Sequence, residues 1–332
     1  MTIKTTDFWD QTAHLKVIDE VFQESVQDKL SDLVGLKIFD DETTKRRNDT
    51  MLIEDGLTGV SYIPEGSEYP DAKPGDTNTF TLQKFKYGAK VVISEEMKMY
   101  NEHGSMAERI RSIVDDGMEM IDQSLADILL RGFSTASYTD VFGKTMSAIG
   151  QMGRALFNAE DNNIIKVGNV QHPKLCAKAL DAAYVMGATR KNRLGQNKAV
   201  KYNLLIVSPL NLGKAKILVN SEKMPGSADN AININKDRFK IVEWSRLSTL
   251  MDGQDTSEYW FVADSKKIKK QLKIKWARHP ELIAPKEVAE TGDDLHRFSY
   301  IYSRGFLNFP YIAGSKGTNL VEDDPIRVKT VS

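Results

Sequence analysis

The feature that most constrains the fold of this chain is a long polar segment that leads into an amphipathic helix, from Gly56 to Phe133. Its first part reads GLTGVSYIPEGSEYPDAKPGDTNTFTLQKFKYGAKVVISEEM and has almost no large apolar residues between Tyr69 and Phe80. A segment so poor in apolar side chains cannot bury enough surface to form a core of its own. We therefore expect it to project from the body and to reach over a neighbouring subunit.

The polar segment is predicted to be an extended hairpin. A continuous ascending strand beyond Val60–Ile63 is disfavoured, because proline removes a ladder donor and glycine weakens a strand, and both recur here: Pro64, Gly66, Pro70, Pro74 and Gly75. The sequence PDAKPGD predicts a turn at the tip, over Asp71–Asp76. The descending strand is predicted over Thr77–Ile93, where apolar residues alternate with lysines.

Two amphipathic helices are predicted. The first covers residues 13–34 and is followed by the charged link DDETTKRRN; together they resemble an arm without a nearby partner surface. The second covers residues 105–131, with a capping box at Ser105 and Glu108 and a helical turn capped by Ser94 before it. About 26 residues give a rod of roughly 39 Å. Its core stripe includes Ile110, Val114, Ile121, Leu125 and Ile128.

The rest of the chain has a mixed helix and strand pattern. Helices are predicted at 146–158, at 173–186 and after the short buried strand 204–207. Further strands are predicted at 239–244, 259–263 and 270–276, and the aromatic-rich end from His296 to Gly314 is predicted to be a last strand pair. No linker separates two independent domains, so the pattern indicates an α+β fold.

Composition excludes several classes of function. The chain has 332 residues and a net charge of −1, so its overall electrostatic potential gives no reason to expect binding to nucleic acid or to an anionic membrane. No apolar run is long enough to span a bilayer, and we expect no membrane partner. One cysteine excludes an internal disulfide framework and favours a reducing compartment.

No catalytic, cofactor or metal motif is evident, and we predict none of these sites. The five histidines are scattered, and there is no GxGxxG, GxxxxGK[ST] or GxSxG sequence. Cys176 lies among apolar residues, which favours a small buried side chain over a nucleophile. Two basic clusters each have two possible interpretations. The cluster with Lys267 and Lys270 is either a solvated strand edge or a contact with a polyanion. The cluster with Arg190, Lys191 and Arg193 is either a mobile surface loop or a contact with another subunit.

The order of these parts resembles a tailed-bacteriophage major capsid protein of the Hong Kong ninety-seven type. The matching stretches are YIPEGSEYP with FKYGAKVVISEEM, SMAERIRSIVDDGMEMIDQSLADILL, NLLIVSPLNLGKAKIL, YWFVADSKKIKKQL and DDLHRFSYIYSRGFLNFPYIAG. The resemblance implies an N-terminal arm at 1–55, an extended loop at 56–93, and a peripheral domain with a long spine helix at 94–144 and 256–305. It also implies an axial domain with a C-terminal tail at 145–255 and 306–332.

The resemblance further implies which residues act in assembly. The extended loop would contact a neighbouring subunit through Tyr62, Glu65, Tyr69, Asp71, Lys73, Asp76, Phe80, Lys84 and Lys86. Some members of this type form a covalent crosslink between a loop lysine and an asparagine of a neighbour. Here the candidates are Lys73, or one of Lys84, Lys86 and Lys90, with Asn308 as the partner.

The implied function is a structural one, in which copies assemble into pentamers and hexamers of an icosahedral-type shell around double-stranded phage DNA. The implied partners are further copies of the chain, a separate scaffold protein unless the sequence is already trimmed, a portal, decoration proteins and non-specific DNA. The implied location is the virion capsid, assembled in the host cytoplasm. Two alternatives stay open: an encapsulin-like shell with enzyme cargo, and an oligomeric α/β enzyme with a swapped arm.

Overall fold

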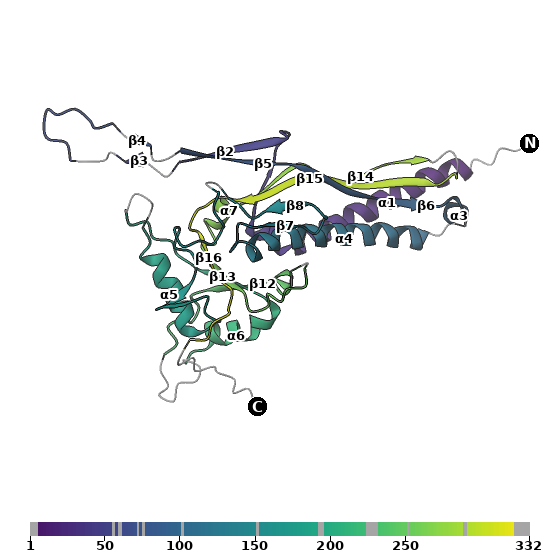
Figure 1. Cartoon of the computed structure of the whole chain (residues 1–332). Coiled ribbons are helices and arrows are strands. Elements are labelled where there is room, and N and C mark those ends of the chain that lie inside the picture. The colour runs from purple at the N-terminus through teal and green to yellow at the C-terminus, as the bar shows by residue number, and fades with distance from the viewer. Residues whose placement is uncertain are drawn as a thin grey trace, which may run out of the picture.

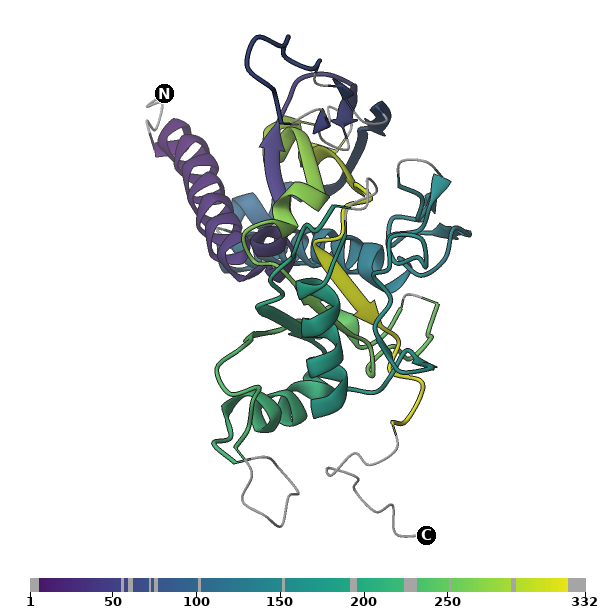
Figure 2. The same ribbon diagram turned by 90° about the vertical axis from the view of Figure 1, so that its left-hand side faces the viewer.

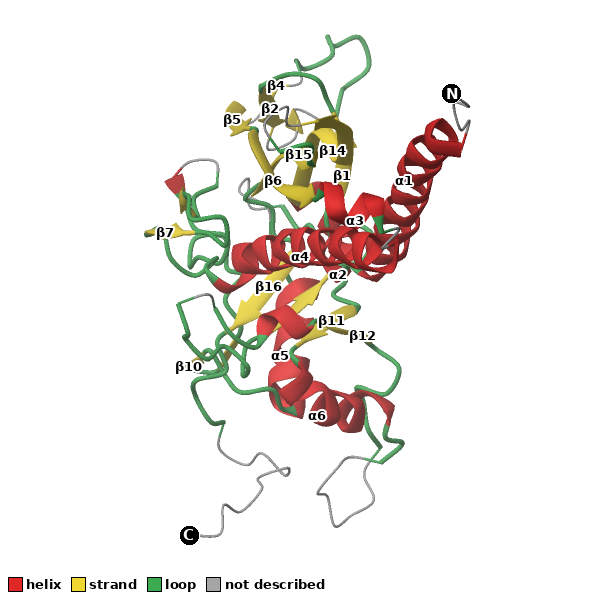
Figure 3. Ribbon diagram, turned by 90° about the vertical axis from the view of Figure 1, so that its right-hand side faces the viewer, coloured by secondary structure: helices red, strands yellow, loops and turns green. Residues whose placement is uncertain are grey.

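The computed structural model describes residues 6–54, 57–58, 62–71, 73–74, 77–100, 103–150, 153–191, 196–223, 232–250, 252–287 and 291–321. The fold is α+β. Figure 1 shows a body with an extended hairpin that points away from it. Within the body one long helix, α4 (His103–Leu130), lies between two four-stranded sheets (Figure 3).

The first sheet has the strand order β1-β14-β15-β6 and combines segments from both ends of the chain. Its strands are β1 (Asp40–Thr43), β6 (Phe85–Ile93), β14 (Leu272–Glu287) and β15 (Asp294–Phe306). The helices next to these strands in the chain are α1 (Thr6–Asp32), α2 (Val34–Ile38), α3 (Glu95–Met99) and α7 (Ile268–Gln271). In β14 the buried residues Leu272, Ile274 and Trp276 alternate with lysines, as the period of a strand requires. The buried residues join a core shared with α4.

The second sheet has the order β12-β11-β13-β16. Its region comprises α5 (Ala177–Ala188), β11 (Leu204–Val207), α6 (Pro209–Asn220), β12 (Lys240–Glu243), η2 (Ser245–Leu247), β13 (Trp260–Ala263) and β16 (Ile312–Ser315). Both faces are covered, which explains the uninterrupted apolar run LLIV. Ile206 and Phe261 belong to the core with α4, while Leu205 and Val262 belong to the core with α5 and α6.

Among the described residues, four two-stranded ribbons complete the fold. They are β2 (Asn48–Glu54) with β5 (Thr77–Gln83), β3 (Leu57–Thr58) with β4 (Lys73–Pro74), β7 (Ser137–Thr139) with β8 (Thr145–Ser147), and β9 (Lys166–Val167) with β10 (Val170–Gln171). The first two ribbons form the extended hairpin of Figure 1.

The long helix matches the sequence prediction closely, although it begins at His103, before the predicted cap at Ser105. All five residues expected in its core stripe are buried by at least 96%: Ile110, Val114, Ile121, Leu125 and Ile128. The predicted turn before it is α3, where the Ser94 hydroxyl accepts a hydrogen bond from the Met97 amide at 3.4 Å. The strand 204–207 is also found as predicted.

The N-terminal helix has a partner surface, whereas the sequence analysis expected none nearby. Ile18, Phe22 and Val26 of α1 are buried in the core that includes α4, and Figure 2 shows α1 along one side of the body. The charged link is not a simple connection, because part of it forms β1 and pairs in parallel with β14. These contacts are far apart in the sequence, and a local pattern does not reveal them.

Other boundaries also differ. The predicted descending strand 77–93 is two strands, broken at Lys84, and only the first belongs to the hairpin. Its partner is β2, not the predicted strand at 60–63. The described part of 146–158 contains no α-helix. The two strands at the end of the chain, β15 and β16, lie in different sheets and are not a pair.

Candidate assembly surfaces

The extended hairpin is a regular ribbon that ends in an exposed loop. Strands β2 and β5 pair from Asn48↔Gln83 to Glu54↔Thr77, and β3 and β4 continue the pairing. Between β3 and β4, the described residues 62–71 are almost all exposed. Tyr62 and Tyr69 leave 89% and 86% of their surface accessible. Two tyrosines held in water at the end of a long ribbon are typical of a surface that becomes buried on association.

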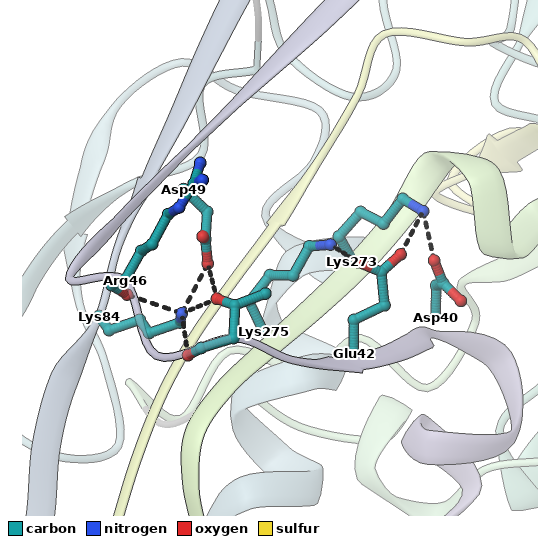
Figure 4. A network of polar contacts seen from close by, with 8 residues as sticks. Asp40, Glu42, Arg46, Asp49, Lys84, Lys273 and Lys275 are labelled. Carbon is teal, nitrogen blue, oxygen red and sulfur yellow. Dashed lines mark hydrogen bonds and ion pairs between the residues drawn. The ribbon is translucent and has the colours of Figure 1, made fainter.

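A buried ion pair fixes the root of the hairpin (Figure 4). The Lys84 side chain is only 1% exposed, and its ammonium lies 2.6 Å from Oδ2 of Asp49. It also donates to the carbonyl oxygens of Thr44 at 2.7 Å and Arg46 at 2.8 Å, and to the Thr44 hydroxyl. The Thr44 hydroxyl in turn donates to Asp49 at 2.6 Å. One lysine therefore joins the end of β5 to the chain that enters β2.

The Asp49 carboxylate is held in its charged form. Burial favours the neutral acid, but hydrogen bonds from Lys84 and Thr44 outweigh burial and lower the pKa of Asp49. Lys84 is consequently not a free loop lysine. The predicted neighbour contact or crosslink through this side chain is wrong for the folded subunit, because its ammonium is buried and fully engaged.

A second set of ion pairs joins β1 to β14 beside the hairpin root (Figure 4). The parallel register places Asp40 beside Lys273 and Glu42 beside Lys275. Both lysines make ion pairs with these acids, and Lys273 also lies 3.8 Å from Glu42. Part of the late basic cluster is therefore neutralised within the chain.

The other predicted loop residues have mixed positions. Glu65 and Asp71 are exposed with the two tyrosines, and Lys86 is exposed on β6. Phe80 is half-buried, because it packs near Gly305 of β15. The backbone of Lys73 forms part of β4, whereas Asp76 lies outside the described residues. Asn308 is 4% exposed, and its amide donates to the Ala155 carbonyl at 3.0 Å. An exposed crosslink partner at Asn308 is therefore wrong for the folded subunit.

The predicted basic contacts divide in the same way. Arg190 is 7% exposed, and its guanidinium donates to the carbonyl oxygens of Asp161 and Asn162, so it is not the surface cation expected. Lys191 and Lys270 are exposed, and Lys267 lies 3.9 Å from Asp264. Arg190, Lys191 and Lys267 line one cavity of about 390 Å³, which Lys270 does not reach. Arg193 lies outside the described residues.

A polar junction that the sequence analysis missed connects the N-terminal region, α4 and the second sheet region. Asp122 of α4 accepts hydrogen bonds from the Gly35 amide and from the Trp244 indole, each at 2.8 Å. Burial raises the pKa of Asp122, although both hydrogen bonds oppose that rise. A side chain at Gly35 would come within 2.7 Å of Leu125 and 2.9 Å of the Asp122 carboxylate, so it would crowd this junction.

An exposed apolar ridge on α6 was also missed. Leu210 and Ile217, seven residues apart and therefore on one stripe of the helix, are 63% and 48% exposed, whereas Ala215 and Leu218 are buried. Between them, a side chain added at Gly213 would meet open space. A helix that is apolar on both sides is normally covered on both, so this ridge is a second candidate contact. Figure 2 shows α6 at the end of the molecule opposite the hairpin.

Neither a metal cluster nor a membrane span is found in the described part of the chain. No group of three metal-ligating side chains occurs among these residues. None of the helices there is long and apolar enough to cross a bilayer.

Comparison with known proteins gives one family and a set of solved structures. The model of a family described as phage capsid protein matches residues 77–304. A structure from Mycobacterium phage Cain is 12% identical, with a TM-score of 0.47 over 84% of this chain and 88% of that chain. One from Gordonia phage Cozz is 10% identical, with a TM-score of 0.49 over 87% and 86%.

A third solved structure is described as the capsid of the cyanophage P-SCSP1u. It is 12% identical, with a TM-score of 0.49 over 83% of this chain and 85% of that chain. No protein with a curated description matches the sequence. The family match extends from the returning strand of the hairpin, through α4 and α6, into β15, and it does not include the exposed hairpin tip at residues 62–71.

Proposed function

The chain belongs to the phage capsid protein family, and from that premise we propose that it is the major subunit of an icosahedral-type shell built from pentamers and hexamers. The observation that carries the proposal is the family match over residues 77–304, which includes most of the body and half of the hairpin. The proposed contents of the shell are double-stranded phage DNA.

The extended hairpin is the proposed contact between neighbouring subunits. Closed shells require heterologous contacts that repeat by rotation, in which one surface meets a different surface of the next copy. A rigid root at Lys84 and an exposed tip at Tyr62 and Tyr69 support this role. The apolar ridge of α6 supports a further contact, at the opposite end of the subunit.

The domain roles follow from this proposal. Residues 94–144 and 256–305 would form the peripheral domain, and the first sheet with α4 supports that grouping. Residues 145–255 and 306–332 would form the axial domain around the symmetry axes, supported by the second sheet with α5 and α6. The N-terminal region would lie along the shell beside α4.

The proposed partners, besides further copies, are a separate scaffold protein, a portal and decoration proteins, with assembly in the host cytoplasm. Contact with packaged DNA would be weak and local, because the net charge of the whole chain is only −1. Exposed Lys191 and Lys270 are candidates for such contact. The subunit has a structural role, and we propose no reaction for it.

The alternatives from the sequence are less well supported. An encapsulin-like compartment shares the expected architecture, but the matching family is described as phage capsid protein. Nuclease treatment of shells from phage-producing cells separates the two, since protected double-stranded DNA favours the phage shell and protein cargo favours the compartment. A swapped-arm enzyme is not favoured by a match to a structural family.

The proposal is tested by negative-stain microscopy and sedimentation of the purified full-length chain. We expect uniform closed particles much larger than one subunit. A monodisperse dimer or tetramer under all assembly conditions, including addition of a scaffold protein from the same genome, would refute the shell. The matched control is Ile217→Asp, which should keep the fold while weakening association through the α6 ridge.

A further inference from the structure

The cavity of about 390 Å³ lies where segments of the two sheet regions meet. The end of α5 and the chain after it contribute residues within 186–191 and 198–200, and residues 308–311 belong to the connection from β15 to β16. Residues 160–162 and Lys267, which comes just before α7, complete the lining. Cavities that bind small molecules have volumes of about 300–1,000 Å³, so this one is large enough for a small ligand.

The lining has more basic than acidic residues. Its basic residues are Arg190, Lys191, Lys198 and Lys267. Its acidic residues, Glu160 and Asp161, both make ion pairs with Arg154, which lies outside the lining. The positive charge of the cavity is therefore in excess, and a concave surface with an excess of one charge attracts ligands of the opposite charge.

The end of α5 explains only part of this positive charge. Arg190 and Lys191 follow the C-terminus of α5, where the helix dipole favours cations, but Lys198 and Lys267 come from other segments. The Lys198 amide donates to the Arg190 carbonyl at 2.8 Å, which holds Lys198 beside the helix end. Among the described residues neither Lys191 nor Lys198, both exposed, makes an ion pair, and Lys267 lies 3.9 Å from Asp264.

Arg190 adds a buried positive charge to the wall of the cavity. The side chain donates hydrogen bonds to the carbonyl oxygens of Asp161 and Asn162 and, at 3.5 Å, to the Tyr202 hydroxyl. These acceptors are neutral oxygens, and burial lowers the pKa of Arg190. A buried cation without full compensation gains from an anion placed next to it, which favours an anionic occupant of the cavity.

The connection between β15 and β16 adds an aromatic surface to the cavity. Phe309 and Tyr311, both half-buried, stack with ring centroids 5.4 Å apart and an interplanar angle of 26°. Nζ of Lys267 lies 5.8 Å from the centroid of the Tyr311 ring, so the aromatic surface and the cations adjoin. Proteins hold nucleotide units with this combination, because a base stacks on the ring and its phosphates bind the cations. An acidic peptide would use the cations alone.

We propose that this cavity binds a nucleoside phosphate. The base stacks on Phe309 and Tyr311, and the phosphates bind Lys191, Lys198 and Lys267. A free nucleotide and a nucleotide at an unpaired end of DNA share this chemistry, and the test below separates these two sources. The inference goes beyond the proposed function, because it concerns the single subunit and does not require a shell. The bound ligand joins the two sheet regions and stabilises the folded chain in proportion to its occupancy.

The test of the cations is a calorimetric titration of ATP into the full-length, unassembled subunit. We expect saturable binding of one ATP per chain. The variant Lys198→Glu/Lys267→Glu should weaken the affinity by at least about tenfold, because the reversed charges repel the phosphates. The matched control Lys216→Glu/Lys240→Glu alters two exposed lysines outside the cavity, on α6 and β12. The control should change the affinity by less than about twofold, because salt screens distant exposed charges.

The test of the aromatic surface uses Tyr311→Leu and inorganic tripolyphosphate, which has no base. Tyr311→Leu should weaken ATP binding by about fivefold or more, because it removes a ring on which the base stacks. The same variant should leave the weaker binding of tripolyphosphate unchanged. Thermal unfolding without ligand checks the fold of each variant.

A photoreactive nucleotide detects the contact in the unaltered chain, so this measurement remains valid if a variant fails to fold. The probe is 8-azido-ATP, whose base carries the reactive group. Irradiation should label the tryptic peptide 305–316, which contains both Phe309 and Tyr311, and an excess of ATP should prevent the labelling.

Competition identifies the source of the ligand. Displacement of ATP by a short DNA duplex with single-stranded ends supports a site for DNA, whereas failure of the duplex to displace ATP supports a site for free nucleotides. Tighter binding of an oligoglutamate peptide than of ATP would overturn the proposal and assign the cations to a protein partner.

Four other results would also overturn the proposal. They are the absence of saturable binding at about 1 mM ATP, equal affinities for tripolyphosphate and ATP, an unchanged affinity in the charge-reversal variant, and labelling only outside residues 305–316. None of these results bears on shell formation, which microscopy of the wild-type chain tests separately.

Discussion

Removal of the Lys84 side chain should loosen the root of the hairpin. In Lys84→Met, the Asp49 carboxylate, whose side chain is 10% exposed, retains the Thr44 hydroxyl as its described hydrogen-bond donor. The carbonyl oxygens of Thr44 and Arg46 lose the ammonium that they share. Breaking a buried pair by removing one partner costs about 3–5 kcal/mol, and we expect a loss of that size in the free energy of unfolding.

The double variant Asp49→Leu/Lys84→Met provides the matched control. It removes the stranded carboxylate, so only the two carbonyl groups remain uncompensated, and we expect a total loss of about 1–2 kcal/mol. Urea unfolding of the unassembled subunit measures both values, and hydrogen exchange of β2 and β5 shows whether the loss is local to the hairpin. A single-variant loss below about 1 kcal/mol, or losses in Asp49→Leu and Lys84→Met that simply add, would refute the reasoning.

The same pair predicts the direction of the pH dependence. Because the pKa of Asp49 is lowered in the folded state, its contribution to stability is present above the unfolded value near about pH 4 and is lost as the pH falls through the folded value. The stability difference between wild type and Lys84→Met should therefore shrink as the pH is lowered through this range. A difference that stays constant would contradict the ion pair.

Three further perturbations distinguish folding from assembly. Ile121→Asp, at a position with no exposed surface, should cost about 4 kcal/mol or more in thermal unfolding, and a wild-type midpoint would contradict its burial. Replacing Asp71–Asp76 by a short Gly-Ser turn should change the Tm of the subunit by no more than about 2 °C. The same variant should assemble poorly, as measured by sedimentation. A large loss of both thermal stability and assembly would contradict a tip that contributes to assembly alone. Asp122→Leu leaves the amide of Gly35 and the indole of Trp244 without an acceptor, and should cost about 2–6 kcal/mol in urea unfolding. A cost below about 1 kcal/mol would show that the junction is not needed.

The parts of the fold that are predictable from sequence are those with a long periodic pattern. Helix α4 has an apolar stripe over many turns, and β11 is a short apolar run between polar residues. Strands β1 and β2 were not predicted, because their sequences DDET and NDTMLIE are polar or irregular. β1 becomes a strand only through its pairing with Lys273 and Lys275, more than two hundred residues away.

The candidate surfaces show the same division. The exposure of Tyr62 and Tyr69 follows from a segment that has too few apolar residues to bury them. The burial of Lys84 could not be predicted from its neighbours Gln83 and Phe85, because the groups that surround it come from another segment. The difference arises where the chain between β1 and β2 crosses above it and supplies carbonyl groups. Asp122 is likewise distinguished only by partners from two distant segments.

The break between β5 and β6 has a consequence for how one sequence can build a curved surface. Only Lys84 separates a strand that belongs to the hairpin from a strand that is fixed in the body. The orientation of the hairpin is therefore set over a single residue, while β6 keeps its register with β15. A shell that contains both five-membered and six-membered rings places chemically identical subunits at different local curvatures. With the root fixed by the buried Lys84–Asp49 pair, these subunits share both the folded body and the start of the hairpin, and adjust to curvature in the ribbon beyond it.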